Sequence, residues 1–167
     1  MYNNNKNKLR ELTLMGMMVA LLEVVKVALM LLPNIELVSL FIVLFTLFLG
    51  KKVLLVVMAF SLLECLIWGF GIWSIGYFYI WPILVIVTLV LKKHSSSLVW
   101  AIVLGFFGLF FGGFFAITTL ITSGIEAAIA YWISGLLFDI IHCVSNFFIA
   151  LVLFKPLNNV LKQLIKV

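Results

Sequence analysis

The chain has 167 residues, of which 66% are hydrophobic and only 10% are charged. Because the apolar share of a soluble domain is usually about half, this composition excludes an ordinary soluble domain and indicates a chain that lies in lipid. The apolar residues, among them 16 Phe, are spread along nearly the whole length, which excludes a single anchor on a soluble body. We interpret the net charge of +5 as a signal of membrane topology, and we expect no nucleic-acid partner.

Polar residues interrupt the apolar sequence and divide it into six predicted spans. A helix that crosses the membrane needs roughly 20 residues. The second span is short, so we expect it to be tilted or partly irregular. The predicted fold class is an all-α integral membrane protein, a six-transmembrane-helix bundle that forms one domain over residues 1–167. Its spans cover about residues 10–32, 37–49, 53–68, 76–91, 98–121 and 126–154.

The segment after Pro156 has a different pattern, in which apolar residues at helical spacing alternate with lysines. This pattern predicts a C-terminal amphipathic tail that lies along the membrane surface. Its apolar residues are Leu157, Val160, Leu161, Leu164 and Ile165, with Lys162 and Lys166 between them.

Basic residues support the span count and orient it, because Lys and Arg concentrate in short cytoplasmic loops. The connections at about 33–36, 69–75 and 122–125 contain none. This alternation predicts that both termini are cytoplasmic. Ten of the eleven basic residues lie near the termini or in the other two connections: Lys6, Lys8, Arg10, Lys51, Lys52, Lys92, Lys93, Lys155, Lys162 and Lys166.

The remaining basic residue, Lys26, lies inside the first span, with Glu23 three positions before it. This spacing places both side chains on one helix face, and a charge at that depth is costly unless it is paired or hydrated. Two interpretations stay open for the pair: an internal salt bridge that fixes packing, or the wall of a ligand cavity. Glu64, in the third span, pairs with Lys26 or a backbone group, or else contacts a ligand.

Acidic residues are nearly missing from the predicted cytoplasmic side, where only Glu11 lies. The others lie inside spans or at their outer ends. Buried acceptors near the outer face suit a polar small molecule that carries hydrogen-bond donors or positive charge. The acidic residues inside spans or at their outer ends are Glu23, Glu36, Glu64, Glu126 and Asp139, of which Glu126 begins the last span at the outer surface.

The last span contains Asp139, His142 and Asn146 at spacing i, i+3, i+7, which aligns them on one stripe of an apolar helix. Lipid would penalise this stripe, so we expect it to face the interior. Two interpretations stay open: the three side chains have their hydrogen bonds satisfied inside the core, or they form the wall of a binding site. A proton relay is a weaker one, because no acidic ladder continues toward the cytoplasmic side.

Aromatic residues gather at the predicted outer end, around the third connection and near the start of the last span. An interfacial belt is common in membrane proteins. The one-sided distribution also fits a stacking wall for a flat ring. Candidates for that wall are Trp68, Trp73, Tyr77 and Trp132.

Four sequence features together resemble the substrate-binding S component of the energy-coupling factor (ECF) vitamin transporters of bacteria. They are the small-xxx-small pair Gly16 and Ala20, the Pro-Asn-Ile-Glu stretch at 33–36, Gly-Lys-Lys at 50–52, and the stretch 134–146 that holds the Asp, His and Asn stripe. The likeness covers nearly the whole chain. The family's docking pair is AxxxA, so Gly16 is a departure from it.

The resemblance implies a subunit in the bacterial cell membrane that captures a vitamin or precursor near its outer face. It implies docking, through Gly16 and Ala20, on a membrane coupling subunit driven by two cytoplasmic ATPase subunits. The sequence shows no P-loop, so uptake would be powered by those partners. Carboxylates and aromatics together favour a heteroaromatic ligand of the pyridoxine, thiamine-precursor or riboflavin type.

Two other classes of membrane protein share some of these features. An intramembrane serine protease would need Ser123 beside His142, but Ser123 lies in an outer loop and His142 about four helical turns deeper. An autonomous secondary carrier or channel is the stronger alternative, although we find no convincing inverted repeat. We predict no enzymatic activity, no catalytic residue, no metal and no cofactor; Cys65 and Cys143 lie in apolar runs and do not suggest a disulfide.

Overall fold

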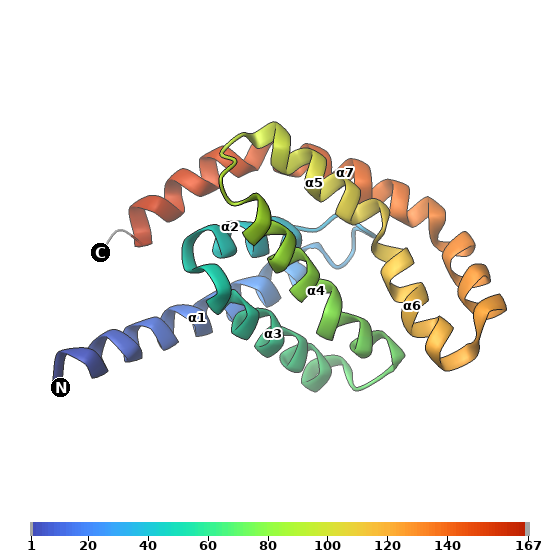
Figure 1. Ribbon diagram of the computed structural model, residues 1–167, viewed down its shortest axis with the longest axis horizontal. Coiled ribbons are helices and arrows are strands. Elements are labelled where there is room, and N and C mark those ends of the chain that lie inside the picture. Colours follow the sequence, from blue (N-terminus) through green and yellow to red (C-terminus); the bar gives the residue numbers. More distant parts are fainter. Residues whose placement is uncertain (1, 166–167) are drawn as a thin grey trace.

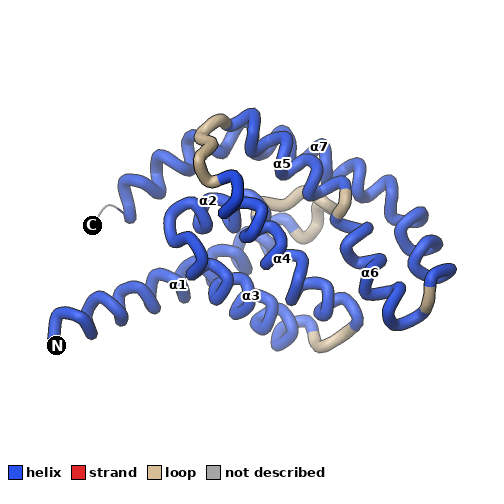
Figure 2. Tube along the Cα trace, viewed as in Figure 1, coloured by secondary structure: helices blue, strands red, loops and turns tan. Residues whose placement is uncertain are grey.

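The computed structural model describes the backbone of residues 2–165 and the side chains of residues 8–164. Over that range the chain consists of helices and short connections, with no strand (Figure 2). The elements in chain order are α1 (Tyr2–Leu29), α2 (Val38–Leu49), the 3-10 turn η1 (Gly50–Lys52), α3 (Val53–Trp68), α4 (Ile72–Leu91), α5 (Ser97–Leu109), α6 (Phe111–Ser123) and α7 (Ile125–Ile165).

Within the described residues, five helical segments are long and apolar enough to cross a membrane, which indicates a multi-pass membrane protein. The all-helical membrane class is therefore confirmed. The segments pair α2 with α3 and α5 with α6, so six separate crossings and the side of the termini stay predictions. The segments are Lys8–Leu29, Val38–Trp68, Ile72–Leu91, Ser97–Ser123 and Ile125–Leu164.

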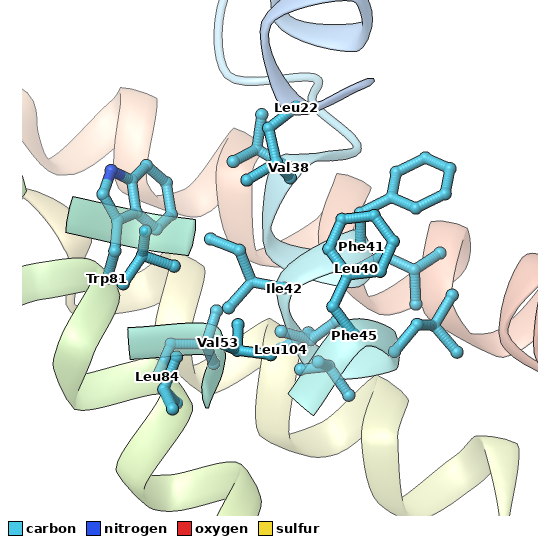
Figure 3. Packing of buried hydrophobic residues seen from close by; sticks show 14 of the residues in the cluster. Leu22, Val38, Leu40, Phe41, Ile42, Phe45, Val53, Trp81, Leu84 and Leu104 are labelled. Atoms are coloured by element: carbon cyan, nitrogen blue, oxygen red, sulfur yellow. The ribbon is translucent and has the colours of Figure 1, made fainter. Parts of the chain in front are cut away.

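The centre of the core is α2, whose residues from Val38 to Thr46 are all buried (Figure 3). At 12 residues, α2 is about 18 Å long, which is short for a hydrocarbon core of about 30 Å. It begins where the carboxylate of Glu36 accepts a hydrogen bond from the Ser39 backbone N–H at 2.8 Å. It ends at Gly50, whose φ of 59° favours glycine, and η1 then turns the chain into α3.

The helices form two groups. In Figure 1, α7 runs along the upper edge with α5 and α6 beside it, and α1 to α4 lie below. The groups meet where α2 contacts α7 and where α4 contacts α6. Tyr79 fixes the second junction, because its hydroxyl bonds the Phe114 carbonyl and lies 2.9 Å from the Thr118 hydroxyl.

The connections with and without basic residues lie toward different ends of the molecule. Both chain ends and η1 lie on the left of Figure 1, whereas the α3–α4 connection and the α6–α7 turn lie at the lower right. Lys52 of η1 forms an ion pair with Glu11 of α1 at the left end. The side chain of Lys6 and the residue Lys166, both counted in the sequence pattern, lie outside the described residues.

The predicted fifth span, 98–121, is divided into α5 and α6 by a bend at Phe110, where φ is −98° and ψ is 5°. The break falls in a segment rich in glycines, and glycine destabilises the interior of a helix because it loses much backbone freedom on folding. At the bend the Gly112 N–H donates to Asp139 Oδ1 of α7 at 2.8 Å, so a backbone group outside the regular ladder is satisfied. The predicted span is thus present as the single apolar segment Ser97–Ser123, with a bend inside it that the sequence did not predict.

The last helix, α7, is 41 residues long and continues through Pro156. The predicted separate tail is thus the C-terminal part of α7, although its helical character is confirmed as far as Ile165. Leu157 and Leu161 pack against the core, while Val160 and Leu164 are exposed. The predicted apolar face is therefore divided between core and surface, and the placement of this segment along the membrane surface stays a prediction.

Candidate functional site

A cavity of about 660 Å³ lies between the two helix groups, toward the end opposite to η1. This volume is within the range of small-molecule sites, about 300 to 1,000 Å³. Its wall combines one ion pair, several aromatic rings and a hydroxyl group. The lining residues are Lys26 of α1, Glu64 and Trp68 of α3, Ile72, Trp73 and Tyr77 of α4, Phe111, Phe115 and Thr119 of α6, and Tyr131 of α7.

The charged part of the wall is an ion pair between Lys26 Nζ and Glu64 Oε2. The Glu64 side chain is fully buried, whereas that of Lys26 is 29% exposed. The ammonium also lies 5.7 Å from the ring centroid of Trp68 and 5.6 Å from that of Tyr77, within cation–π range. Of the two partners considered from sequence for Lys26, the structure selects Glu64.

Glu23 lies beside Glu64 and Lys26 but forms no ion pair within the described residues. Both of its carboxylate oxygens are buried and lack a hydrogen-bond partner there, as does Oε1 of Glu64. Two carboxylates thus face one ammonium, and the group has a formal charge of −1 when all three are ionised. Buried acceptors without donors are costly and are suited to a ligand that brings donors or positive charge.

Aromatic residues on α4 form a ladder along one face, because Trp73, Tyr77 and Trp81 recur every four residues. The ring centroids of Trp73 and Tyr77 are 5.3 Å apart, and so are those of Tyr77 and Trp81, both edge to face. Trp81 is buried in the core, while Trp73 and Tyr77 line the cavity. The predicted stacking wall therefore has a structural counterpart at Trp68, Trp73 and Tyr77.

The polar stripe of α7 is buried, as expected, with Asp139, His142 and Asn146 each less than 5% exposed. None of the three lines the cavity. His142 lies directly behind the wall, because the Phe111 ring lines the cavity and meets the His142 ring edge to face with centroids 4.8 Å apart.

His142 joins α7 to the connection between α1 and α2. Its Nε2 donates to Glu36 Oε1 at 3.3 Å, and the Ser145 hydroxyl donates to the Asn34 carbonyl at 2.7 Å. Burial acts to raise the pKa of Glu36, but hydrogen bonds from His142 and Ser39 outweigh it and hold that pKa below its usual value. Glu36 is therefore an ionised acceptor, and its hydrogen bond with His142 holds this connection against α7.

The remaining candidates lie elsewhere. Glu126 and Trp132 are exposed and do not line the cavity. Gly16 and Ala20 lie on an exposed face of α1, and a Cβ added to Gly16 would meet nothing within 4 Å. Ser123 is exposed at the end of α6, while His142 is buried under Phe111, so the two protease candidates have different surroundings.

Sequence reasoning missed the α6 side of the cavity, namely Phe111, Phe115 and Thr119. Their spacing of four residues places them on one helix face, and this was the available signal. It is obscured because the segment has phenylalanines on every side. No three His, Cys, Asp or Glu side chains between residues 8 and 164 come together as metal ligands would.

The fold and cavity thus define a multi-pass helical membrane protein with a ligand-sized aromatic and charged site. Comparison of the chain with known protein families, curated proteins and solved structures found no match.

Proposed function

We propose that this protein is the membrane-embedded substrate-capture subunit of a vitamin uptake system, of the S-component type. Its ligand is a heteroaromatic vitamin or precursor of the pyridoxine, thiamine-precursor or riboflavin type. The subunit lies in the bacterial cell membrane and is energised by a coupling subunit with two cytoplasmic ATPases.

The observation that supports this proposal most strongly is the cavity of about 660 Å³ and the chemistry of its wall. Trp68, Trp73 and Tyr77 offer faces and edges for a flat ring. The unpartnered oxygen of Glu64 offers a buried acceptor that gives the bound ring an orientation.

The position of the cavity is a second support. It lies at the end whose connections contain no Lys or Arg in the sequence, which is the outer end under the positive-inside rule. A subunit that collects a scarce solute from outside needs its site there. The exposed face of α1 with Gly16 and Ala20 is then free to contact a coupling subunit.

Intrinsic fluorescence tests the capture function directly. The purified full chain in nanodiscs is titrated with pyridoxine, thiamine, the thiamine pyrimidine and riboflavin, and native mass spectrometry identifies any ligand that co-purifies. We expect at least one vitamin to change the tryptophan emission with a saturable curve. The variants Trp68→Phe and Trp73→Phe should reduce this change, because these rings line the cavity. Trp100→Phe is the matched control, since Trp100 stacks on Phe154 in the core between α5 and α7.

Affinity provides a second readout. Glu64→Gln removes one partner of a buried charged contact, which typically costs about 2 to 5 kcal/mol, a loss of roughly 30-fold or more in affinity. Glu11→Gln is the control, because Glu11 pairs with Lys52 at the opposite end. Equal titration curves for wild type and Glu64→Gln would contradict the proposed site. Uptake into liposomes by the chain alone would favour the autonomous carrier instead.

A further inference from the structure

Lys26 has two carboxylates within its reach, and this arrangement says more about the ligand. Its ammonium is paired with Glu64 and lies between the rings of Trp68 and Tyr77. Glu23, three residues earlier on the same helix face, has two buried oxygens without partners among the described residues. A short swing of the flexible lysine side chain would therefore exchange one carboxylate for the other.

The position that the ammonium holds is a cation site by its chemistry. A fully buried carboxylate and two aromatic faces are the groups that recognise ammonium and other organic cations. The site opens into the cavity, because Lys26, Glu64, Trp68 and Tyr77 all line it. Lys26 is the most exposed member of its ion pair, so it is the part that a ligand meets.

We propose that the captured ligand carries a cationic nitrogen, which takes the place of the Lys26 ammonium between Trp68, Tyr77 and Glu64 while Lys26 transfers to Glu23. This inference rests on the capture function proposed above and adds the charge class of its substrate. Lys26 acts as a tethered counter-ion: it keeps Glu64 paired before the ligand arrives, which lowers the cost of a buried charge in the membrane. After the exchange, two cations neutralise two carboxylates, and the formal charge of −1 is removed.

Three ring compounds that differ at one substituent test the charge class. Pyridoxamine carries an ammonium, pyridoxine a hydroxyl and 4-pyridoxate a carboxylate at the same ring position. We expect wild type to bind pyridoxamine about tenfold or more tighter than pyridoxine, with 4-pyridoxate weakest, because only the ammonium of pyridoxamine can form an ion pair with Glu64; a tenfold ratio corresponds to about 1.4 kcal/mol. Preference for 4-pyridoxate, or binding of none of the three at millimolar concentration, would overturn the inference.

Two variants test the exchange. Lys26→Met removes the competing cation, so the affinity for pyridoxamine should rise about tenfold while that for pyridoxine changes less than about threefold. Glu23→Gln removes the second acceptor, so the affinity for pyridoxamine should fall about tenfold with little effect on pyridoxine. A merely structural role of either residue would move both compounds together, and that result would overturn the exchange.

Folding of Lys26→Met is monitored by gel filtration and by its melting curve. If it does not fold, Lys26→Met combined with Glu64→Gln replaces the ion pair by a neutral pair. This double variant should bind pyridoxine but lose the preference for pyridoxamine, and a retained preference would contradict the inference. The inference can fail while the capture function stands. If the protein binds some other vitamin saturably, the capture function is supported even though the cationic ligand class is not.

Discussion

Single residues show two ways in which this protein accommodates polar groups inside an apolar chain. Lys26 and Glu64 satisfy each other across two helices, and an unpaired charge at that depth would cost several kcal/mol. Asp139 instead accepts a backbone N–H, that of Gly112, at the bend between α5 and α6. Lys26 and Glu64 line the cavity. Asp139 stabilises the bend between α5 and α6.

The role of Asp139 at the bend leads to a stability prediction. Asp139→Ala should leave the Gly112 N–H without an acceptor, and an unsatisfied buried donor costs about 1 to 3 kcal/mol. We expect a clearly lower melting temperature for Asp139→Ala and a smaller decrease for Asp139→Asn, whose amide oxygen still accepts. Thermal unfolding followed by tryptophan fluorescence measures both.

Asn159→Ala, exposed on the same helix, is the control and should melt like wild type. If Asp139→Ala also melts like wild type, the contact with Gly112 does not stabilise the bend. Asp139 was predicted from sequence as a binding residue. Because Asp139 does not line the cavity and accepts the Gly112 N–H, stability is the more direct readout.

Pairs of helices are held together by close backbone contact as much as by large side chains. On α5, a Cβ added to Gly108 would lie 2.7 Å from the His142 carbonyl oxygen of α7, which is closer than any Cβ can come. At Gly105 the nearest atom would be 3.4 Å away, at the edge of ordinary contact. The glycines at 105, 108, 112 and 113 all face residues of α7, so they form a flat surface on which α7 packs.

Alanine substitutions along this face should differ accordingly. Gly108→Ala should force α5 away from α7 and destabilise the protein by about 1 to 3 kcal/mol, as overpacking typically does. Gly105→Ala should cost much less. Gly135→Ala of α7, where nothing lies within 4 Å, should be neutral or slightly stabilising. Equal melting temperatures for the first two variants would contradict this account of the interface.

The exposed face of α1 is a second surface on which a helix could pack closely. Gly16→Leu should abolish uptake of the identified vitamin by cells that contain the coupling subunit and ATPases, because a large side chain would block close helix docking. Ligand affinity of the isolated chain should stay unchanged, since a Cβ added to Gly16 would meet nothing within 4 Å. Gly135→Leu is the matched control, and loss of affinity in Gly16→Leu would indicate a role other than docking.

Over the whole molecule, the basic residues of η1 and the cavity lie toward opposite ends. The turn η1 contains Lys51 and Lys52, and both chain ends lie on the same side of the molecule in Figure 1. The cavity is instead lined by the end of α3 and the start of α4. Such a distribution suits a subunit that takes its ligand on one side of the membrane and meets its energy source on the other.

Cysteine labelling tests this orientation. In a background without Cys65 and Cys143, Phe70→Cys in the α3–α4 connection should react with a membrane-impermeant maleimide in intact cells. Ser95→Cys in the α4–α5 connection, next to Lys92 and Lys93, should react only after the cells are lysed. Both positions are exposed, so accessibility alone does not separate them. The reverse pattern would invert the predicted topology.

The sequence by itself determined the membrane class, the helical content and most helix positions. These properties follow from hydropathy and polar breaks along the chain, which are local. Burial of Asp139, His142 and Asn146 was also predictable, because a polar stripe on an apolar helix has one favourable direction.

Only the tertiary structure decided which groups meet. Lys26 had Glu23 as its neighbour in sequence and Glu64 as a distant alternative, and the packing of α1 on α3 selected Glu64. The bend at Phe110, the contact of Asp139 with Gly112 and the position of His142 behind Phe111 likewise depend on how α6 lies against α7. Hydropathy describes how each helix relates to lipid, but the rotation and spacing of helices against one another arise from side-chain packing between distant segments.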